Sequence, residues 1–304
     1  MNKRKLFLII TLLLASFTIF GSASVSAEGN DQIEISISPV SHKLELEQGE
    51  TYTGNVIVAN TGKKEFDYEI SVRPYGVADS SYSNVTFEAN KYTDIVNWIT
   101  FDQESGHLLP NESNTIKFTI AVPEKAVSIG QYLVIAASAV DQVPEEQSGL
   151  NVTGSVGSVV YATIAGDAKN SGEITENDFP SFYFNGPVTF NSTVKNTGDV
   201  HNTATYTIEI RNFFNNNVVF ENAEEPITHI ILPDTERFES NTWEAPMLGV
   251  FRAKQTIEYA GQTSIKEGII IVCPAWFIFV SIFVIISITL RIILAIKKYR
   301  ENKL

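Results

Sequence analysis

Alternating apolar residues dominate the middle of this 304-residue chain. In the segments 33–37, 66–72, 116–122 and 206–210, every second residue is isoleucine, valine, phenylalanine or tyrosine. Successive side chains of a β-strand point to opposite faces, so this period of two predicts strands with one buried face. The β-branched and aromatic residues that predominate here favour the same structure. Much of the chain therefore has to fold into β-sheets.

Polar turn sequences separate these strands at short intervals. Most combine Gly with a small or polar neighbour: Gln48-Gly49, Asn60-Thr61-Gly62, Ser105-Gly106, Asn196-Thr197-Gly198 and Ala260-Gly261. Many short strands joined by polar turns are typical of β-sandwiches and not of a parallel α/β sheet. We attribute the two Asn-Thr-Gly triplets to tight turns that need a positive φ, and not to ligand binding.

An internal repeat indicates two domains of the same kind. Residues 56–75 resemble residues 192–214, because each segment has an apolar strand, an Asn-Thr-Gly turn and a second alternating strand. Later motifs recur in the same order: Leu109-Pro110 as Leu232-Pro233, and Gly130-Gln131-Tyr132 as Gly249-Val250-Phe251. The fold class that we predict is all-β, with two tandem Ig-like β-sandwich domains and one C-terminal transmembrane α-helix.

The predicted first domain covers residues 28–168 and the second covers residues 169–268. The segment 141–150 is polar and contains Pro144, but residues 154–165 predict a further strand. Because the second copy also ends on a last strand, at residues 263–272, we place the polar loop between the last two strands of the first domain.

Both ends of the chain predict export and anchoring. Residues 1–27 have three basic residues, an apolar stretch and a run of small residues, which together predict a signal peptide cleaved after Ala27. Residues 269–290 are apolar over a length that can cross a bilayer, so we expect a transmembrane helix at residues 269–292 and a cytoplasmic tail at residues 293–304. Trp276 and Tyr299 suit its two interfaces.

Charge sets the expected orientation. Four basic residues follow the span: Lys297, Lys298, Arg300 and Lys303. The positive-inside rule then predicts a single-pass type I protein of the cell membrane, with an extracellular ectodomain and the C-terminus inside. The last predicted strand runs almost directly into the span, so we expect a short two-domain rod close to the bilayer.

The ectodomain is acidic and has no disulfide. Between the signal peptide and the span lie 14 basic and 34 acidic residues, a net charge of −20. Such a surface keeps the protein soluble and repels nucleic acid and anionic lipid head groups. The one cysteine, Cys273, lies in the apolar run. An exported domain of this size without disulfides, behind a short signal peptide, favours a bacterial source.

Residues able to carry catalysis are sparse. The four histidines, His42, His107, His201 and His229, do not have the spacing of metal ligands. Glu145-Glu146 and Glu224-Glu225 lie beside proline in polar loops, and adjacent side chains point apart, unlike a glycosidase pair. We therefore predict no enzyme, no catalytic, cofactor-binding or metal-binding residue and no cofactor, and we assign no ligand-binding residue.

Three further features are attributed to the fold or to the membrane anchor, and not to a functional site. Leu232-Pro233-Asp234-Thr235-Glu236 differs by one residue from the sorting signal L-P-x-T-G, but no membrane segment follows it directly. Trp98 and Trp243 are expected in the core or at strand edges. Arg291, near the inner end of the span, is expected to reach the cytoplasmic interface.

The layout of the chain resembles the WxL-interacting surface proteins of Gram-positive bacteria. The resemblance is carried by the opening ISISPVSHKLELEQGETYTGNVIVANTG at residues 35–62, by Trp98-Ile99, by Leu109-Pro110 and by Gly130-Gln131-Tyr132. It implies a first domain that binds peptidoglycan and a second domain that holds a WxL-bearing partner.

Two functions follow as hypotheses. The first is a membrane-anchored bacterial cell-surface protein whose two sandwiches form a non-enzymatic binding or adhesion module for the cell wall or for a secreted partner protein. The alternative is an accessory or sensing subunit of a membrane complex that associates through its span, for which Arg291 is the one indication.

Overall fold

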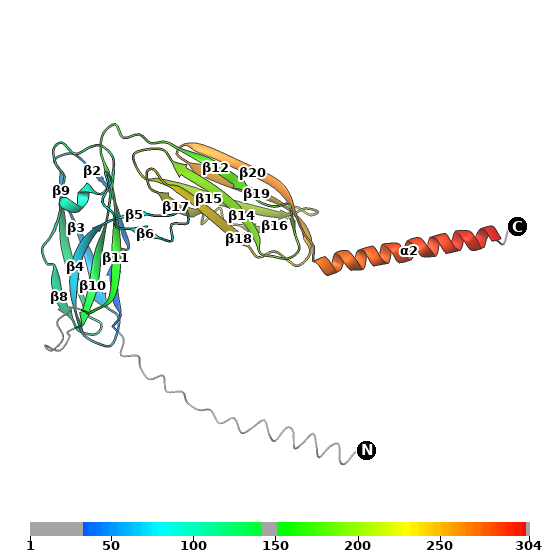
Figure 1. Ribbon diagram of the computed structural model, residues 1–304, viewed down its shortest axis with the longest axis horizontal. Helices are drawn as coiled ribbons and strands as arrows, with labels where there is room; N and C mark the ends of the chain where they lie inside the picture. The colour runs from blue at the N-terminus through cyan, green and yellow to red at the C-terminus, as the bar shows by residue number, and fades with distance from the viewer. Residues whose placement is uncertain (1–32, 142–150, 302–304) are drawn as a thin grey trace, which may run out of the picture.

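The computed structural model describes residues 33–141 and 151–301 as two β-sandwiches followed by one long helix (Figure 1). This confirms the predicted all-β class with two Ig-like sandwiches and one C-terminal apolar helix. The predicted signal peptide and the pair Glu145-Glu146 lie outside the described residues. The two sandwiches are set at an angle to each other, so the expected rod is bent.

The first sandwich packs a four-stranded sheet on a five-stranded sheet. The first sheet has, in spatial order, β1 (Ile35–Ser38), β3 (Thr51–Asn60), β9 (Ser113–Ala121) and β7 (Ile99–Phe101). The second has, in spatial order, β2 (Ser41–Leu46), β11 (Asn151–Ile164), β10 (Gly130–Asp141), β4 (Phe66–Pro74) and β8 (Ser105–Leu108). A 3-10 turn, η1 (Asp94–Asn97), and a short hairpin of β5 (Gly76–Val77) and β6 (Val85–Thr86) lie between β4 and β7.

The period of two in the sequence becomes the core of this sandwich. Val56 and Val58 of β3 pack with Ile116, Phe118 and Ile120 of β9, all fully buried. The predicted strand at 154–165 is part of β11, which pairs antiparallel with β10 and parallel with β2. It therefore closes the first sandwich, as the repeat indicated.

The second sandwich packs a three-stranded sheet on a larger one. The smaller sheet has, in spatial order, β12 (Gly172–Asp178), β14 (Val188–Asn196) and β18 (Glu236–Trp243). The larger has β13 (Phe182–Tyr183), β20 (Gln262–Val272), β19 (Gly249–Tyr259), β15 (Asn202–Asn212) and β16 (Val218–Glu221), with β17 (Ile227–Ile231) also paired to β15. Between the sandwiches, β11 ends at Ile164 and β12 begins at Gly172. The boundary at residues 168/169 lies in this connection and stays a prediction.

Trp98 and Trp243 lie where the sequence indicated. Trp243 is buried, and its ring meets Phe251 edge-on with the ring centroids 5.0 Å apart. Trp98 packs, partly buried, against the core of the first sandwich.

A buried asparagine anchors the same turn in each sandwich. The Asn60 side chain donates to the carbonyls of Lys64, at 2.9 Å, and Leu108, at 3.2 Å, and accepts from the Gly62 N–H at 3.0 Å. Asn196 repeats this with Val200 at 2.8 Å, Ile231 at 2.9 Å and the Gly198 N–H at 2.9 Å. Each side chain therefore ties its turn to a strand distant in sequence.

The predicted reason for the Asn-Thr-Gly turns was wrong. None of their residues is among the described residues with positive φ. The asparagines are required because their amides satisfy three backbone groups each, all buried at Asn196 and two of them buried at Asn60. Positive φ occurs instead in the turns that these asparagines hold, at Asn111 and Asp234, directly after the two Leu-Pro pairs.

The expected start of the helix was also wrong. Residues 269–272 extend β20, where they pair with residues 249–252 of β19. The helix, α2 (Ala275–Glu301), begins after Cys273 and Pro274. Its segment Ala275–Tyr299 is long and apolar enough to cross a membrane, with a mean hydropathy of 2.7.

We expect Asn60→Ala to destabilise the protein by about 2–4 kcal/mol, because two buried backbone groups and one part-buried group lose their partner. Thr61→Ala, which removes one exposed hydrogen bond of 3.3 Å to Glu34, is the control and should cost less than about 1 kcal/mol. Urea unfolding of the full chain in detergent micelles measures both. Equal losses for the two variants would contradict the anchoring role.

Candidate functional site

The two sandwiches meet across a cluster of tyrosines. Tyr92 and Tyr132 of the first sandwich pack with Leu232 of the second, and all three are buried. Tyr75, Tyr82, Tyr161 and Ile230 surround them. Aromatic rings contribute large apolar area with a polar tip, which suits a contact that also has to be hydrogen-bonded.

The β5–β6 hairpin of the first sandwich extends across this contact and binds the second sandwich (Figure 1). At its tip, the Tyr82 hydroxyl accepts from the Leu232 N–H at 2.9 Å and hydrogen-bonds the Thr235 hydroxyl. The Arg237 guanidinium lies over the Tyr82 ring, 4.5 Å from its centroid. The Phe238 N–H donates to the Ser80 carbonyl at 2.8 Å, so the hairpin also bonds to the free edge of β18.

The Leu232-Pro233-Asp234 turn is the matching element of the second sandwich. Asp234 projects at positive φ and accepts from the Tyr92 hydroxyl at 2.8 Å and from the Lys91 ammonium at 3.2 Å. The Tyr92 hydrogen bond, helped by Lys91, lowers the pKa of the Asp234 carboxyl. This segment, noted in the sequence as the repeat of Leu109-Pro110 and as a near match to a sorting signal, is an interdomain contact.

His201 lies inside the same contact. Its ring meets Tyr132 edge-on at 5.6 Å and Tyr161 at 5.5 Å between centroids. Burial, together with the charge of Lys43, lowers the pKa of His201 to about 4. The histidine is therefore neutral at physiological pH and packs as an aromatic ring.

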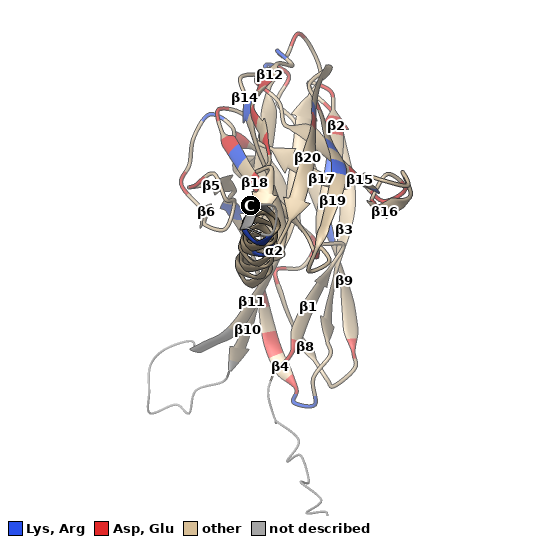
Figure 2. Cartoon of the chain, turned by 90° about the vertical axis from the view of Figure 1, so that its right-hand side faces the viewer, with Lys and Arg blue, Asp and Glu red and all other residues tan. Residues whose placement is uncertain are grey.

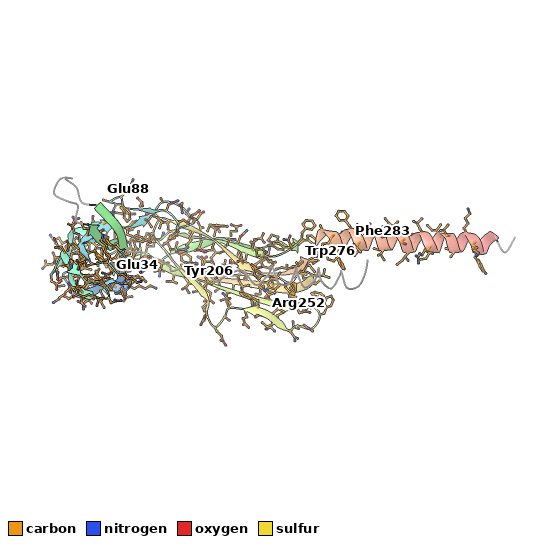
Figure 3. The ribbon with its side chains drawn as sticks, turned by 90° about the horizontal axis from the view of Figure 1, so that it is seen from below. Glu34, Glu88, Tyr206, Arg252, Trp276 and Phe283 are labelled. Atoms are coloured by element: carbon orange, nitrogen blue, oxygen red, sulfur yellow. The ribbon has the colours of Figure 1, made fainter. Side chains whose placement is uncertain are left out.

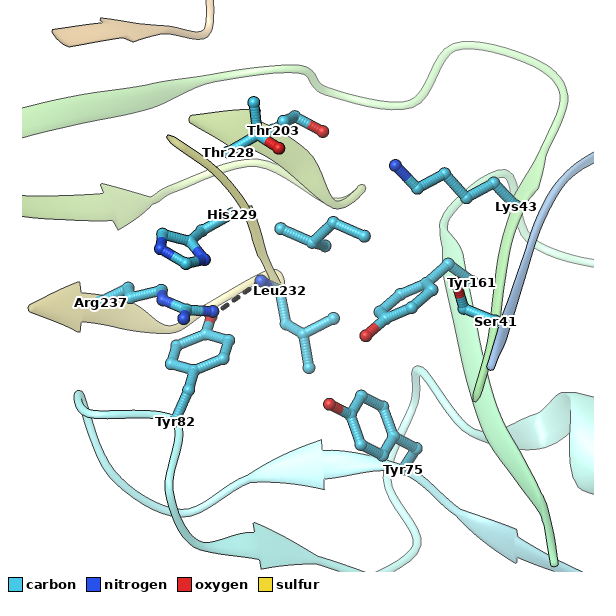
Figure 4. A pocket seen from close by; sticks show the side chains of 11 residues that line it. Ser41, Lys43, Tyr75, Tyr82, Tyr161, Thr203, Thr228, His229, Leu232 and Arg237 are labelled. Atoms are coloured by element: carbon cyan, nitrogen blue, oxygen red, sulfur yellow. Dashed lines mark hydrogen bonds between the residues drawn. The ribbon is translucent and has the colours of Figure 1, made fainter. Parts of the chain in front are cut away.

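Beside the cluster, a pocket of about 350 Å³ opens between the sandwiches (Figure 4). The first sandwich supplies Ser41, Lys43, Tyr75, Tyr82 and Tyr161, and the second supplies Thr203, Thr228, His229, Ile230, Leu232 and Arg237. Neither sandwich alone forms this pocket, and its lining is rich in hydroxyl groups and cationic side chains.

The cations of the pocket differ in how far they are neutralised. Glu239 accepts from Arg237 at 2.6 Å and lies 3.2 Å from the His229 ring nitrogen, and these two partners lower the pKa of Glu239 against its burial. Lys43 is exposed, projects toward the pocket in Figure 4, and has no ion pair among the described residues. Its charge is therefore available to a ligand.

The remaining candidates from the sequence do not form a site. His42 lies edge-on to Phe118, and burial lowers its pKa. His107 is exposed and pairs with Asp67 at 2.8 Å, which raises its pKa. Glu224-Glu225 lies on an exposed connection between β16 and β17. Among the described residues, no group of three or more His, Cys, Asp or Glu side chains could hold a metal ion.

The pocket residues were missed because their strands are far apart in sequence. One signal was available: tyrosine recurs at residues 75, 82, 92, 132 and 161, all in the predicted first domain. Some of these tyrosines fall outside the alternating strands, in segments such as 76–92 that carry no strand pattern. Surplus tyrosines in a loop indicate a contact surface, because their hydroxyl tips need partners.

No protein family and no curated protein matches this sequence. Several solved structures are similar to this chain, all at low similarity. The class 5 fimbriae chaperone CfaA is 13% identical over 79% of this chain and 100% of its own, with a TM-score of 0.36. The CsuC–CsuE chaperone–tip adhesion subunit complex of Acinetobacter baumannii Csu pili gives a chain 11% identical, over 77% of this chain and 97% of its own, with a TM-score of 0.37. The Escherichia coli chaperone DraB is 12% identical over 78% and 97%, with a TM-score of 0.33.

We expect Tyr82→Phe to loosen the contact between the sandwiches. The change removes the hydrogen bonds to Leu232 and Thr235 but keeps the ring under Arg237. A loss of about 1–3 kcal/mol raises the separated population by roughly 5- to 150-fold. Spin labels at Lys117→Cys and Glu224→Cys, in a Cys273→Ser background, report this as a broader distance distribution. Ser83→Ala, an exposed neighbour, is the control and should leave the distribution unchanged.

Acid is expected to weaken the fold through His201. Its folded-state pKa of about 4 lies below the ordinary 6.5, so between these values only the unfolded chain binds the proton. Stability is therefore complete above pH 6.5 and falls as the pH decreases toward 4. His201→Phe keeps the ring and should reduce the loss of unfolding free energy between pH 7.5 and 4.5 by about 2 kcal/mol.

His107→Phe is the matched control for this measurement. The pKa of His107 is raised, so its contribution is present at low pH and is lost as the pH rises, which is the opposite sign. An unchanged pH dependence in His201→Phe would contradict the assignment.

Proposed function

We propose that this chain is a membrane-anchored bacterial cell-surface protein whose two sandwiches form one binding module for the cell wall or for a secreted protein. The observation that carries the proposal is the interdomain pocket, which takes residues from both sandwiches and is bordered by a hydrogen-bonded contact. A contact that fixes the two halves of a pocket keeps it preformed, as ligand sites usually are.

The chemistry of the pocket favours a ligand segment that carries a carboxylate. Lys43 offers a cation without an ion pair among the described residues, and the hydroxyls of Tyr75, Tyr161 and Ser41 offer hydrogen bonds beside it. The ectodomain as a whole is acidic and repels anions, so the local cation Lys43 restricts where an anionic segment can bind. Carboxylates are present both in the stem peptides of peptidoglycan and in acidic protein segments.

Location is the second part of the proposal. The predicted signal peptide at residues 1–27, the apolar helix α2 and the basic residues after it support an extracellular ectodomain and a cytoplasmic C-terminus. The resemblance to WxL-interacting surface proteins is consistent with this location and with both ligand sources. The histidines and the acidic pairs singled out in the sequence do not come together in a catalytic cluster among the described residues, which supports a non-enzymatic role.

We expect Lys43→Glu to weaken binding of the natural partner by about 10- to 100-fold, because a charge-assisted hydrogen bond becomes a repulsion. Two measurements separate the ligand sources. Co-sedimentation of the detergent-solubilised full chain with purified peptidoglycan tests the wall, and a photo-crosslinking residue at Tyr75, used on intact cells, tests a secreted protein.

Lys117→Glu is the matched control, since Lys117 lies on β9 in the other sheet of the first sandwich. It changes the net charge equally and should leave binding intact. Arg291→Leu, at the span, should also leave partner capture unchanged, and its loss there would favour the accessory-subunit alternative. Equal binding by Lys43→Glu and Lys117→Glu would remove the pocket from the proposal.

A further inference from the structure

The end of the second sandwich nearest α2 has exposed apolar side chains at the tips of three loops. Phe184 follows β13 and is 55% exposed, Phe214 lies in the β15–β16 turn and is 81% exposed, and Met247 lies in the β18–β19 loop and is 63% exposed. The strand register places all three at one end, because Asn212 pairs with Phe251 and Gly249 pairs with Val272.

No stalk separates this end from the helix. Only Cys273 and Pro274 lie between β20 and α2, and Pro274 is buried. The Cys273 N–H donates to the Tyr183 carbonyl at 2.9 Å, and the Phe277 N–H donates to the Pro274 carbonyl at 3.0 Å. The connection is therefore part of the sandwich, and the loop tips lie at the level where α2 begins.

The side chains near the start of α2 are arranged as at a membrane interface, with a tryptophan at the junction and arginines farther from the helix. Figure 3 shows Trp276 at the junction with the sandwich, and its side chain is 56% exposed. Arg252 and Arg211 pair across β19 and β15 on the outer face, about three residues or roughly 10 Å above the start of β19. Tryptophan belts and arginines placed behind apolar groups are typical of protein surfaces in contact with lipid.

We propose that the loops carrying Phe184, Phe214 and Met247 rest in the outer interfacial layer of the bilayer that α2 crosses. This inference rests on the proposed membrane anchoring. The second sandwich then contacts lipid directly and stands on the membrane with its far end, which holds the first sandwich, directed away. Figure 2, which looks along α2 from its C-terminus, shows the sandwiches behind the helix.

These loops face lipid and not a protein partner, because the anchoring helix itself fixes what they face. With only two residues between β20 and α2, loops at the level of Ala275 meet the same bilayer that the helix enters. Charge near this end is mixed and does not oppose the contact, because Arg252 and the ion pair of Arg211 with Glu209 lie here beside Glu244 of the β18–β19 loop. The turn at the opposite end, 197–199, is polar.

The test uses the full chain in phosphatidylcholine nanodiscs, with single bimane labels in a Cys273→Ser background. One label replaces Phe184 at the loops, one replaces Thr263 at the far end of β20, and one replaces Ile285 in α2. Lipids with a nitroxide on the acyl chain, and iodide in the water, quench the labels from opposite sides. We expect the label at 184 to be quenched by nitroxide lipid at least threefold more than the label at 263, and by iodide at least threefold less.

Two substitutions to aspartate test whether the apolar loop side chains cause the lipid contact. Phe214→Asp with Met247→Asp should at least halve the nitroxide quenching of the label at 184. Val40→Asp with Val127→Asp, two exposed apolar residues of the first sandwich, is the matched control and should leave it unchanged. An unaltered urea unfolding midpoint shows that the charged variant still folds.

Each contrary result has its own meaning. Iodide access at 184 equal to that at 263 overturns the lipid contact. Shielding from iodide without quenching by nitroxide lipid also overturns it, because the loops are then covered by protein, such as a second copy. If the label at 285 is not quenched by nitroxide lipid, the membrane anchoring itself fails, which is distinguishable from failure of the loop contact alone.

Discussion

The contact between the two sandwiches depends on one buried side chain, that of Asn196. Its amide holds the carbonyl of Ile231 and so fixes the chain immediately before Leu232-Pro233-Asp234. The turn then presents Asp234 to Lys91 and Tyr92 and the Leu232 N–H to Tyr82. Asn60 holds the equivalent turn in the first sandwich, where Asn111 takes the place of Asp234. One fold therefore uses the same anchored turn twice, and only the second copy has become a docking element.

The architecture could be predicted from the sequence because burial of one sheet face leaves a period of two in each strand. The strands around Phe66, Ile116 and Tyr206 follow this rule, and the repeat places them in two copies. The start of α2 was ambiguous in the sequence, because residues 269–272 are apolar and fit both the predicted last strand at 263–272 and the predicted span at 269–292. Their assignment to β20 depends on pairing with β19, which is a tertiary contact. The role of the asparagines failed for a similar reason, since their partners Leu108 and Ile231 are distant in sequence.

The pocket shows a further limit of sequence reasoning. Lys43, Tyr161 and Arg237 are ordinary strand residues in the sequence, and only the angle between the sandwiches brings them together. The average charge was also a poor guide to local chemistry. A chain whose residues 28–268 carry a net charge of −20 still places cations at the pocket and, with Arg252 and the ion-paired Arg211, near the end next to α2.

The pocket and the arginines near α2 lie toward opposite ends of the second sandwich, and under the proposed anchoring this sets their distances from the membrane. Thr203, at the pocket, and Asn212, at the loop end, are nine residues apart on β15, or about 30 Å along a strand. The sandwich is joined without a stalk to α2 at one end and bonded by Tyr82 and Asp234 at the other. If α2 anchors the chain as proposed, a pocket held this way keeps both its height and its orientation above the bilayer. A flexible tether would let the two sandwiches search for a partner, whereas the proposed arrangement positions them for one that arrives at a fixed distance from the membrane.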